Sequence, residues 1–522
     1  MFRFKKIKKM ELQRKFKLPR MIANSIAKTA FKIKTFWKKE SLEHQEKFLF
    51  NLIHKCRNTV FWKRYWFKDI ETIEQFQREV PIFTYKEFQP RVEYMLKWEK
   101  DIAYPWKIPL FAVSSGTTWE KWKYLPLTKE HINSSQFNWW TKLISYYCKA
   151  NPKTKICTWK TIAIWWTFVE NPYTKEHNVW YITAILQKRT PWYARLFKSP
   201  SPDIAFIEDR EEKSKKIVEE TLHQNITWIT GQPSRCTQFL YKVLEKTWKS
   251  NIHEIWPDFE IFFWWWMAVD LYKDTLKELF PDPKFKYRQS YNASEWFFAC
   301  QCENDADDML LLTDNWVFYE FIPHEEFGKE NPKVISLKDV ELDKEYVIVI
   351  TTNAWIRRYI IWDTVKFTEI EPYYKIKITW RTKYYIDVVG EWTTVEYTDK
   401  AIIEACKKVW AIATDYTAWP VTPKWTQRWA YERIIEFWKE PKDIKEFQKV
   451  LDEELEKAFS NYYDERNYNN TLDELIVHKA PAWTFQKRLE HNNRAMGCSK
   501  VPKLMNDRHV LEEIFEIMDN KY

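Results

Sequence analysis

The chain contains only five glycines but 32 tryptophans among its 522 residues, and this ratio restricts the turns it can form more than any other feature. Proteins contain on average about 7% glycine. Here, glycine and tryptophan together, 37 residues, make up that share. Glycine supplies the positive φ of tight turns and helix ends, which a bulky side chain adopts only at a cost. Either the fold has few such positions, or tryptophan occupies them.

Several tryptophans stand where glycine is expected. Trp316 follows Asp314-Asn315 between two apolar runs, in the form of an Asn-Gly hairpin turn. Trp248 stands where a helix ends and needs a C′ glycine, and the run Trp264-Trp265-Trp266 would overfill a core. We interpret the sequence as the translation of a gene in which UGA encodes glycine, as in some bacteria, but has been read as tryptophan. A genuinely tryptophan-rich protein is the alternative, and Trp256 is a candidate for a true tryptophan in either case.

Composition and charge indicate a soluble globular protein of two or more domains. No apolar segment of 18 residues lacks a charge, so we expect no transmembrane helix. Residues 1–40 hold 14 Lys+Arg against 2 acidic residues, which leaves the rest of the chain at −2. We interpret the basic run from Phe2 to Lys17 as a solvated extension; contact with nucleic acid or anionic lipid is the alternative. The eight cysteines have neither CxxC nor metal-ligand spacing, which favours reduced thiols in the cytoplasm.

The hydrophobic patterns predict an α/β fold with layered sheets. A basic extension covers residues 1–20, a large domain covers 21–379 with a β-rich part at 308–390, and a smaller, mobile α+β domain covers 380–522. The individual predictions are helices at 25–56, 214–222, 237–244, 399–409, 443–459 and 507–517, and strands at 161–164, 226–229, 309–313, 317–321, 346–351, 359–361, 384–389 and 430–437.

The most informative motif follows the apolar residues 110–113. It places Ser114, Ser115, Thr117 and Thr118 around Gly116, with Lys123 shortly after. Backbone N–H and hydroxyl groups in such a loop can converge on phosphate oxygens, and the lysine adds positive charge. The spacing differs from that of a Walker P-loop, and alone it is more often an ordinary loop.

Together with later blocks, this loop resembles the auxin-responsive-promoter family of acyl acid amido synthetases, within the adenylate-forming superfamily. When the suspect tryptophans are read as glycine, Ser114 to Pro126 is similar to the phosphate loop of that family. The similar blocks keep their order along the chain, which makes chance agreement remote. They lie at residues 262–267, 291–298, 318–323, 351–355, 358–363, 378–383, 390–391, 481–485, 500–502 and 506–508.

The resemblance implies a two-step ligase that uses ATP and Mg²⁺ and a large adenylate-forming domain with a mobile C-terminal domain. A carboxylic acid attacks the α-phosphate of ATP to give an acyl-adenylate and pyrophosphate, and an amine or amino acid then displaces AMP. Lys500 and Glu295 are the implied catalytic residues, with Glu295 near Mg²⁺ and Lys500 brought to the adenylation site by rotation about the region of Trp380. The implied nucleotide-binding residues are Ser114, Ser115, Gly116, Thr117, Thr118, Lys123, Tyr291, Ala293, Ser294, Arg358, Asp363 and Arg381.

Each assignment has an ordinary structural alternative. Glu295 could cap a helix, Asp363 could be a turn residue, and Lys500 could be a solvated surface lysine. Two other functions also stay open. The chain could be an acyl-CoA ligase of the same superfamily, or a non-enzymatic protein that binds anionic partners through its basic arm. The sequence does not identify the acid or the amine.

Overall fold

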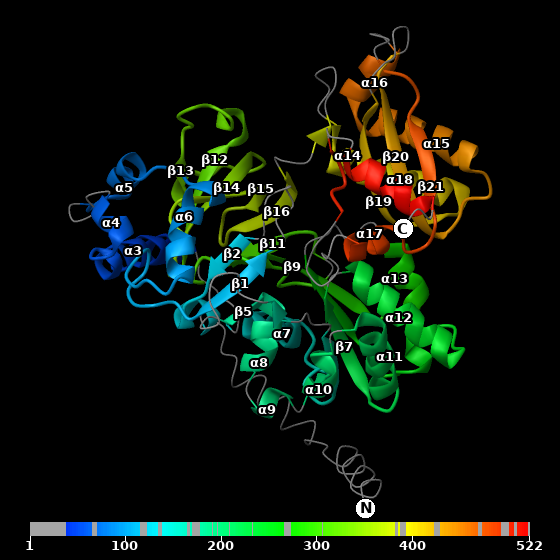
Figure 1. Cartoon of the computed structure of the whole chain (residues 1–522), viewed down its shortest axis with the longest axis horizontal. Helices are drawn as coiled ribbons and strands as arrows, with labels where there is room; N and C mark the ends of the chain where they lie inside the picture. Colours follow the sequence, from blue (N-terminus) through cyan, green and yellow to red (C-terminus); the bar gives the residue numbers. More distant parts are fainter. Residues whose placement is uncertain are drawn as a thin grey trace, which may run out of the picture.

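The fold is described by a computed structural model of the chain (Figure 1). The described residues run from Lys38 to Asp519. Gaps fall at 65–69, 115–122, 134–137, 164–167, 170–177, 191, 196, 208, 232, 266–272, 305, 382–384, 387–392, 422–427, 468–471, 492–500 and 506–508. The basic run predicted near the N-terminus therefore lies outside the described residues, as does Lys500.

Twelve strands of the described residues form one continuous sheet. They are β3 (Lys160–Ala163), β6 (Lys198–Ser199), β7 (Ile226–Gly231), β8 (Ile261–Trp265), β9 (Lys286–Asn292), β10 (Phe297–Cys300), β11 (Met309–Leu311), β12 (Val317–Pro323), β13 (Ile335–Ser336), β14 (Glu345–Thr352), β15 (Tyr359–Glu369) and β16 (Lys375–Arg381). Their order is β13-β12-β14-β15-β16-β11-β10-β9-β8-β7-β3-β6. Pairs from β6 to β9 are parallel, and pairs from β9 to β13 are antiparallel. The sheet therefore changes from parallel to antiparallel pairing at β9.

Helices bury both faces of the parallel half. In β8, Ile261 and Phe263 pack in one cluster with α7 (Asn138–Ala150). The alternate residues Phe262 and Trp264 pack in another cluster with α11 (Arg210–Thr221), α12 (Pro233–Thr247) and α13 (Lys273–Leu279). Successive strand residues point to opposite faces, so a strand covered on both sides must be apolar throughout. The continuous apolar run at 261–264 satisfies this requirement. Three shorter helices, α8 (Ile182–Arg189), α9 (Trp192–Arg195) and α10 (Pro202–Ala205), lie between β5 and α11 in sequence.

The antiparallel half packs against the N-terminal helices and a small second sheet. The helices are α3 (Lys38–Cys56), α4 (Val60–Arg64), α5 (Ile73–Glu79) and α6 (Tyr85–Leu96). The second sheet has the order β2-β1-β5-β4, formed by β1 (Leu110–Ser114), β2 (Lys123–Pro126), β4 (Phe168–Val169) and β5 (Asn178–Tyr181). Gln45 joins α3 to the sheet, since its amide donates to the carbonyls of Thr313 at 2.7 Å and Val317 at 2.6 Å.

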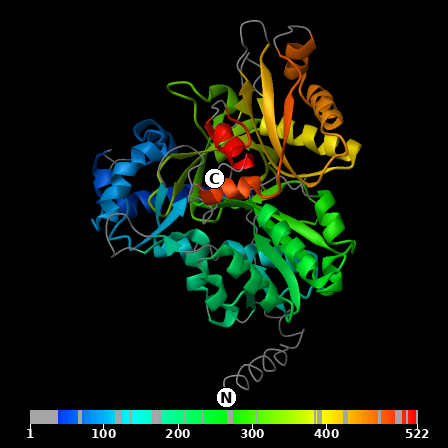
Figure 2. The same ribbon diagram turned by 45° about the vertical axis from the view of Figure 1, so that its right-hand side comes forward.

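The residues after β16 form a smaller domain with its own cores. A three-stranded sheet of β19 (Ile412–Val421), β20 (Ala430–Lys439) and β21 (Ile476–Ala480) lies at its centre. Around it are α14 (Val395–Val409), α15 (Ile444–Ala458), α16 (Ser460–Asn467), α17 (Thr484–His491) and α18 (His509–Met518), with a short pair β17 (Tyr385–Ile386) and β18 (Thr393–Thr394). Figures 1 and 2 show this domain next to the α12 and α13 side of the large domain. Tyr241 of α12 stacks on Trp438 with ring centroids 3.9 Å apart, and Lys242 lies 5.6 Å from the Trp483 ring.

Tryptophan occupies most of the left-handed backbone positions that are not glycine. Among the described residues, ten non-glycine residues have φ between 37° and 73°, and seven of them are tryptophan. Trp248 and Trp410 directly follow α12 and α14, with φ of 54° and 58°. Their side chains are 93% and 80% exposed, so packing does not explain their presence. The other five are Trp98, Trp106, Trp316, Trp362 and Trp483.

Most of the predicted elements are present, and one prediction is wrong. The strands expected at 226–229 and 346–351 and the helices expected at 237–244 and 443–459 are β7, β14, α12 and α15. The layered α/β architecture is therefore confirmed. The turn at Trp316 exists, with φ of 57°, but it does not close a hairpin. β11 and β12 are not neighbours in the sheet, because β11 pairs with β10 and β16 and β12 pairs with β13 and β14.

Candidate active site

The base of the Ser/Thr/Gly loop is fixed by two paired strands. Ser114 ends β1 and lies opposite Lys123 in the antiparallel register with β2. The pairing holds the two ends of the loop side by side. Residues 115–122 lie outside the described residues, and these include Ser115, Gly116, Thr117 and Thr118. The structure therefore shows where the loop begins and ends, at Ser114 and Lys123.

Lys123 lies beside a tyrosine at the start of α6. Its ammonium is 5.3 Å from the centre of the Tyr85 ring. The Tyr85 hydroxyl accepts the N–H of Tyr124 at 2.8 Å and donates to the Tyr124 carbonyl at 3.3 Å. These bonds join α6 to β2 next to the loop. No sequence pattern points to Tyr85, since its contacts with Lys123 and Tyr124 are made only in the fold.

Glu295 lies in the tight turn that follows β9. The turn is closed by a bond from the Ala293 N–H to the Trp296 carbonyl at 2.8 Å. It projects from the carboxyl end of β9, where the sheet changes from parallel to antiparallel pairing. In open α/β sheets, ligands bind outside the carboxyl ends of the parallel strands. The turn Ala293, Ser294 and Glu295 follows the carboxyl end of β9, which is parallel to β8, so it lies at the edge of the sheet where a ligand site is expected.

Two tyrosines from distant segments flank the Glu295 carboxylate. The hydroxyl of Tyr359, the first residue of β15, donates to Glu295 Oε1 at 3.4 Å. Burial raises the pKa of Tyr85, and the negative charge of Glu295 raises it further. Glu295 thus lies beside β15 and near enough to Tyr85 of α6 to affect its pKa, on the side where β1 ends and β2 begins. Trp355 packs against both tyrosines, with ring centroids 6.5 Å from Tyr85 and 6.1 Å from Tyr359.

Asp363 and Tyr291 form the second polar pair of the site. The Tyr291 hydroxyl donates to Asp363 Oδ2 at 2.9 Å, and both side chains are 4% exposed. Tyr291 lies near the end of β9, two residues before the Glu295 turn. The two pairs share β15, which contains both Tyr359 and Asp363. Asp363 lies in β15 opposite Arg381 of β16. A carboxylate can accept bonds from two hydroxyl groups, and Tyr291 holds this one in a fixed orientation.

Arg358 has a structural environment. Its guanidinium, 3% exposed, donates through Nε to both carboxylate oxygens of Glu320 at 3.1 Å. It also donates to the carbonyl of Gln77 at 2.7 Å and to that of Val80. These bonds tie the end of α5 to β12 and β15. The phosphate contact suggested by the sequence is therefore not supported by this geometry, and we leave Arg358 out of the proposed site.

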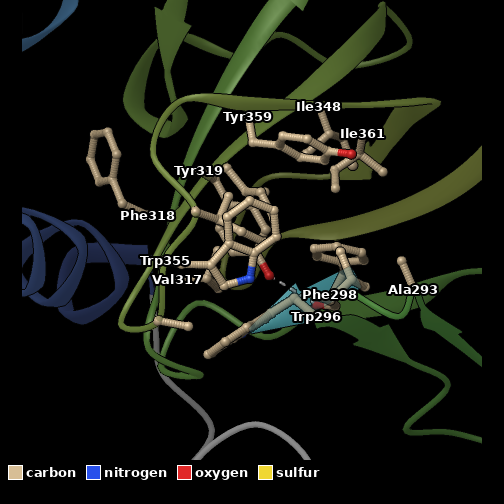
Figure 3. Close-up of a cluster of buried hydrophobic side chains, with 14 of the residues drawn as sticks. Ala293, Trp296, Phe298, Val317, Phe318, Tyr319, Ile348, Trp355, Tyr359 and Ile361 are labelled. Atoms are coloured by element: carbon tan, nitrogen blue, oxygen red, sulfur yellow. Dashed lines mark hydrogen bonds between the residues drawn. The ribbon is translucent and has the colours of Figure 1, made fainter. Parts of the chain in front are cut away.

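The aromatic cluster behind the site contains two of the suspect tryptophans. Figure 3 shows Trp296 and Trp355 among Phe298, Tyr319 and Tyr359. The Trp296 ring lies 4.4 Å from the ring of His131, and burial lowers the pKa of His131 to about 3. The Trp355 N–H has no hydrogen-bond acceptor, whereas that of Trp296 donates to the Asn315 carbonyl at 2.8 Å. Both indoles fill space next to the two polar pairs.

The chain matches three consecutive domains of one family. Residues 35–285 match the GH3 family N-terminal domain, residues 310–381 the central domain and residues 396–509 the C-terminal domain. Indole-3-acetic acid-amido synthetase GH3.3 of Arabidopsis thaliana is 20% identical over 394 residues, and the match covers 62% of this chain and 64% of that protein. Indole-3-acetic acid-amido synthetase GH3.4 of the same plant is 22% identical over 395 residues, with the same coverage. The chain thus spans about 64% of the length of these curated relatives.

Solved structures show the same fold. The GH3.15 acyl acid amido synthetase has a TM-score of 0.76 at 14% identity, over 92% of this chain and 94% of that chain. A 2-hydroxyisobutyryl-CoA ligase in the postadenylation state, in complex with 2-HIB-AMP, has a TM-score of 0.59 at 12% identity, over 92% of each chain. The large sheet-rich domain followed by a smaller C-terminal domain is therefore the fold that this chain shares with these two enzymes.

Proposed function

The chain belongs to the GH3 family, and on that basis we propose that it is an ATP-dependent ligase that adenylates a carboxylic acid and transfers the acyl group to an amine or amino acid. The observation that carries the proposal is the pairing of Tyr291 with Asp363 and of Tyr359 with Glu295 at the carboxyl end of β9. The paired ends of β1 and β2 hold the Ser114 to Lys123 loop nearby.

Each residue has a role that fits its environment. Asp363, oriented by Tyr291, would accept hydrogen bonds from the ribose hydroxyls of ATP. The backbone and hydroxyl groups of residues 114–118 and the Lys123 ammonium would hold the β- and γ-phosphates as pyrophosphate leaves. Lys500 would offset the charge that develops between the carboxylate and the α-phosphate. Ala293 and Ser294 would face the nucleotide from the turn after β9, and Arg381 would lie at the domain junction near residue 380.

Glu295 fits a Mg²⁺ ligand. Mg²⁺ takes oxygen ligands, and in nucleotide sites it is commonly held by one or two carboxylates, phosphates and water. In the part of the chain that the structure describes, no group of three His, Cys, Asp or Glu side chains could hold a metal ion. Glu295 would therefore act with nucleotide phosphates rather than within a protein cage. Bound Mg²⁺ would neutralise phosphate charge, while Tyr359 orients the carboxylate from β15.

We further propose that many of the tryptophans are glycine when the gene is translated with UGA as glycine. A non-glycine residue in the left-handed region costs about 1–2 kcal/mol. Seven such tryptophans would therefore cost about as much as the whole net stability of a domain, about 5–15 kcal/mol. Glycine at Trp119, Trp296, Trp355, Trp362 and Trp380 would also remove indoles from the phosphate loop, the site and the hinge. Trp256 differs from the seven left-handed tryptophans, since its φ is not positive, its indole is fully buried and its N–H donates to the Thr221 carbonyl at 3.3 Å.

Two further proposals concern the cellular location of the protein and its basic N-terminal extension. We infer a cytoplasmic location, which the free thiols of the seven described cysteines support. Among the described helices, none is long and apolar enough to cross a membrane. We propose that residues 1–20 are a solvated extension, with 21–379 and 380–522 as the two catalytic domains. If the extension instead bound a polyanion, that binding would weaken steeply with salt.

The test is carboxylate-dependent exchange of pyrophosphate into ATP, with the chain as written and with glycine at the suspect positions. The acids would be indole-3-acetic acid, 2,4-DB, 2-hydroxyisobutyrate and benzoate, and the twenty amino acids and coenzyme A would then be compared for AMP release. We expect exchange in the glycine version and AMP release with an amino acid. Release with coenzyme A alone would instead identify an acyl-CoA ligase. Peptide mass spectrometry of the native protein that found tryptophan at 264–266 and 410 would refute the recoding.

A further inference from the structure

The segment that follows Lys500 is attached to the small domain by an isolated parallel β-bridge between Leu504 and Ala418. Residues 501–505 run beside β19, where the Ala418 N–H donates to the Lys503 carbonyl at 2.8 Å and the Met505 N–H donates to the Ala418 carbonyl at 3.0 Å. Val501 and Leu504 are 4% and 1% exposed. The backbone directly after Lys500 is thus held by hydrogen bonds and by two buried side chains.

A charged side chain of this segment makes a further attachment. Lys503 Nζ lies 3.0 Å from Asp399 Oδ1 and 4.4 Å from the centre of the Tyr416 ring. The Tyr416 hydroxyl donates to the same Asp399 oxygen at 2.5 Å. These three residues form what we call the Asp399 cluster, and each comes from a different segment of the small domain.

The Asp399 cluster anchors the described segment 501–505, which directly follows Lys500 in sequence. Asp399 lies in the second turn of α14, the first helix after the domain junction, so the ion pair ties the segment to the helix that follows the hinge in sequence. The side chains of Lys503 and Asp399 are only 17% and 13% exposed. A pair so shielded from water is screened little by salt and keeps a defined geometry. The Lys503 ammonium is therefore paired with Asp399 rather than placed to bind a substrate.

We propose that Lys503, held by Asp399 and Tyr416, is a positioning residue that sets the approach of Lys500 to the reacting α-phosphate. This inference rests on the proposed function, because it requires Lys500 to act in adenylation. A group that stabilises charge only in the transition state must be placed within a fraction of an ångström. Loss of the cluster would then slow adenylation without weakening nucleotide binding and without affecting attack of the amine on the acyl-adenylate.

The test is Lys503→Met, which removes the charge and keeps an apolar stem. Pyrophosphate exchange would be measured with the acid that supports it in the unchanged chain. Aminolysis would be measured with synthetic acyl-adenylate of that acid and the amino acid that releases AMP. We expect kcat for exchange to fall at least 10-fold, with KM for ATP and the rate of aminolysis unchanged. Lys479→Met is the matched control, since Lys479 pairs with Glu440 at 2.8 Å on the exposed surface of the same domain.

A second variant separates positioning from folding. Asp399→Asn keeps the size of the side chain and should show the same selective loss, and the double variant should be no slower than either single variant. Equal losses in both half-reactions, or an unchanged rate of exchange in Lys503→Met, would overturn the inference. Absence of exchange in the unchanged chain with every acid would refute the proposed function, and the inference with it.

Discussion

At the scale of single residues, backbone conformation separates two kinds of tryptophan. Trp410 follows α14 in the left-handed region, with φ of 58° and 80% of its surface exposed. Trp410→Gly should therefore stabilise the small domain by about 1 kcal/mol, because it removes strain and loses little packing. Trp256→Gly should instead destabilise the large domain by about 3–5 kcal/mol, because it leaves a cavity and removes one of the two hydrogen bonds to the Thr221 carbonyl. Urea unfolding of both variants measures these changes in the free energy of unfolding. Destabilisation by Trp410→Gly would contradict the proposal that residue 410 is glycine.

The hydroxyl of Tyr291 allows a similar test within the site. Tyr291→Phe removes the bond to Asp363, and a bond to a charged group contributes about 1.5–3 kcal/mol. We expect KM for ATP to rise about 10-fold or more while kcat stays nearly constant, because the lost interaction is equal in the ground and transition states. Tyr374→Phe is the control, since the buried Tyr374 hydroxyl has no hydrogen-bond partner and lies before β16. An unchanged KM in steady-state kinetics of Tyr291→Phe would exclude a ribose contact at Asp363.

At the scale of elements, the start of α17 depends on a buried carboxyl group. Glu436 of β20 accepts the backbone N–H groups of Trp483 at 3.1 Å and Phe485 at 3.3 Å. Burial raises its pKa from 4.5 to about 7. The folded state therefore holds its proton between pH 4.5 and 7 while the unfolded state releases it. The free energy of unfolding should fall by about 3 kcal/mol as pH rises through this range. In Glu436→Gln the free energy of unfolding, measured with denaturant, should not fall between pH 5 and pH 7.5. An equal fall in both proteins would contradict the role of Glu436.

Elements differ in how far the sequence could predict them. Strands such as β7 and β14 are buried on both faces, so their continuous apolar runs are recognisable. The failed hairpin at Trp316 shows the limit, because strand order depends on distant partners that a local turn signal does not contain. The residues of the site also differ in how far the sequence could predict them. Glu295 and Asp363 could be assigned by residue type and resemblance, whereas Tyr359 could not, since it reaches Glu295 only through tertiary packing.

At the scale of the whole molecule, the buried cores divide near residue 380. Among the described residues, the clusters of the large domain end at Ile376, and the two clusters of the small domain begin at Ile386. The contacts between the domains include the Tyr241–Trp438 stack and the Lys242–Trp483 contact. Trp483 has φ of 72°, and glycine at that position would remove its ring from the interface. Two cores joined in this way favour domains that move and unfold separately.

Because the two domains have separate cores, we expect heating to show two unfolding transitions. A non-hydrolysable ATP analogue should bind the large domain, which carries Asp363 and Glu295, and at 100 times its Kd should stabilise that domain by about 2.7 kcal/mol. Calorimetry should therefore show one transition that moves upward by a few degrees with the analogue and a second that stays constant. Asp363→Asn should abolish the movement and leave both transitions visible. A single transition that moves as a whole would instead mean that the interface couples the domains into one cooperative unit, and rotation about residue 380 would then carry a much larger energetic cost.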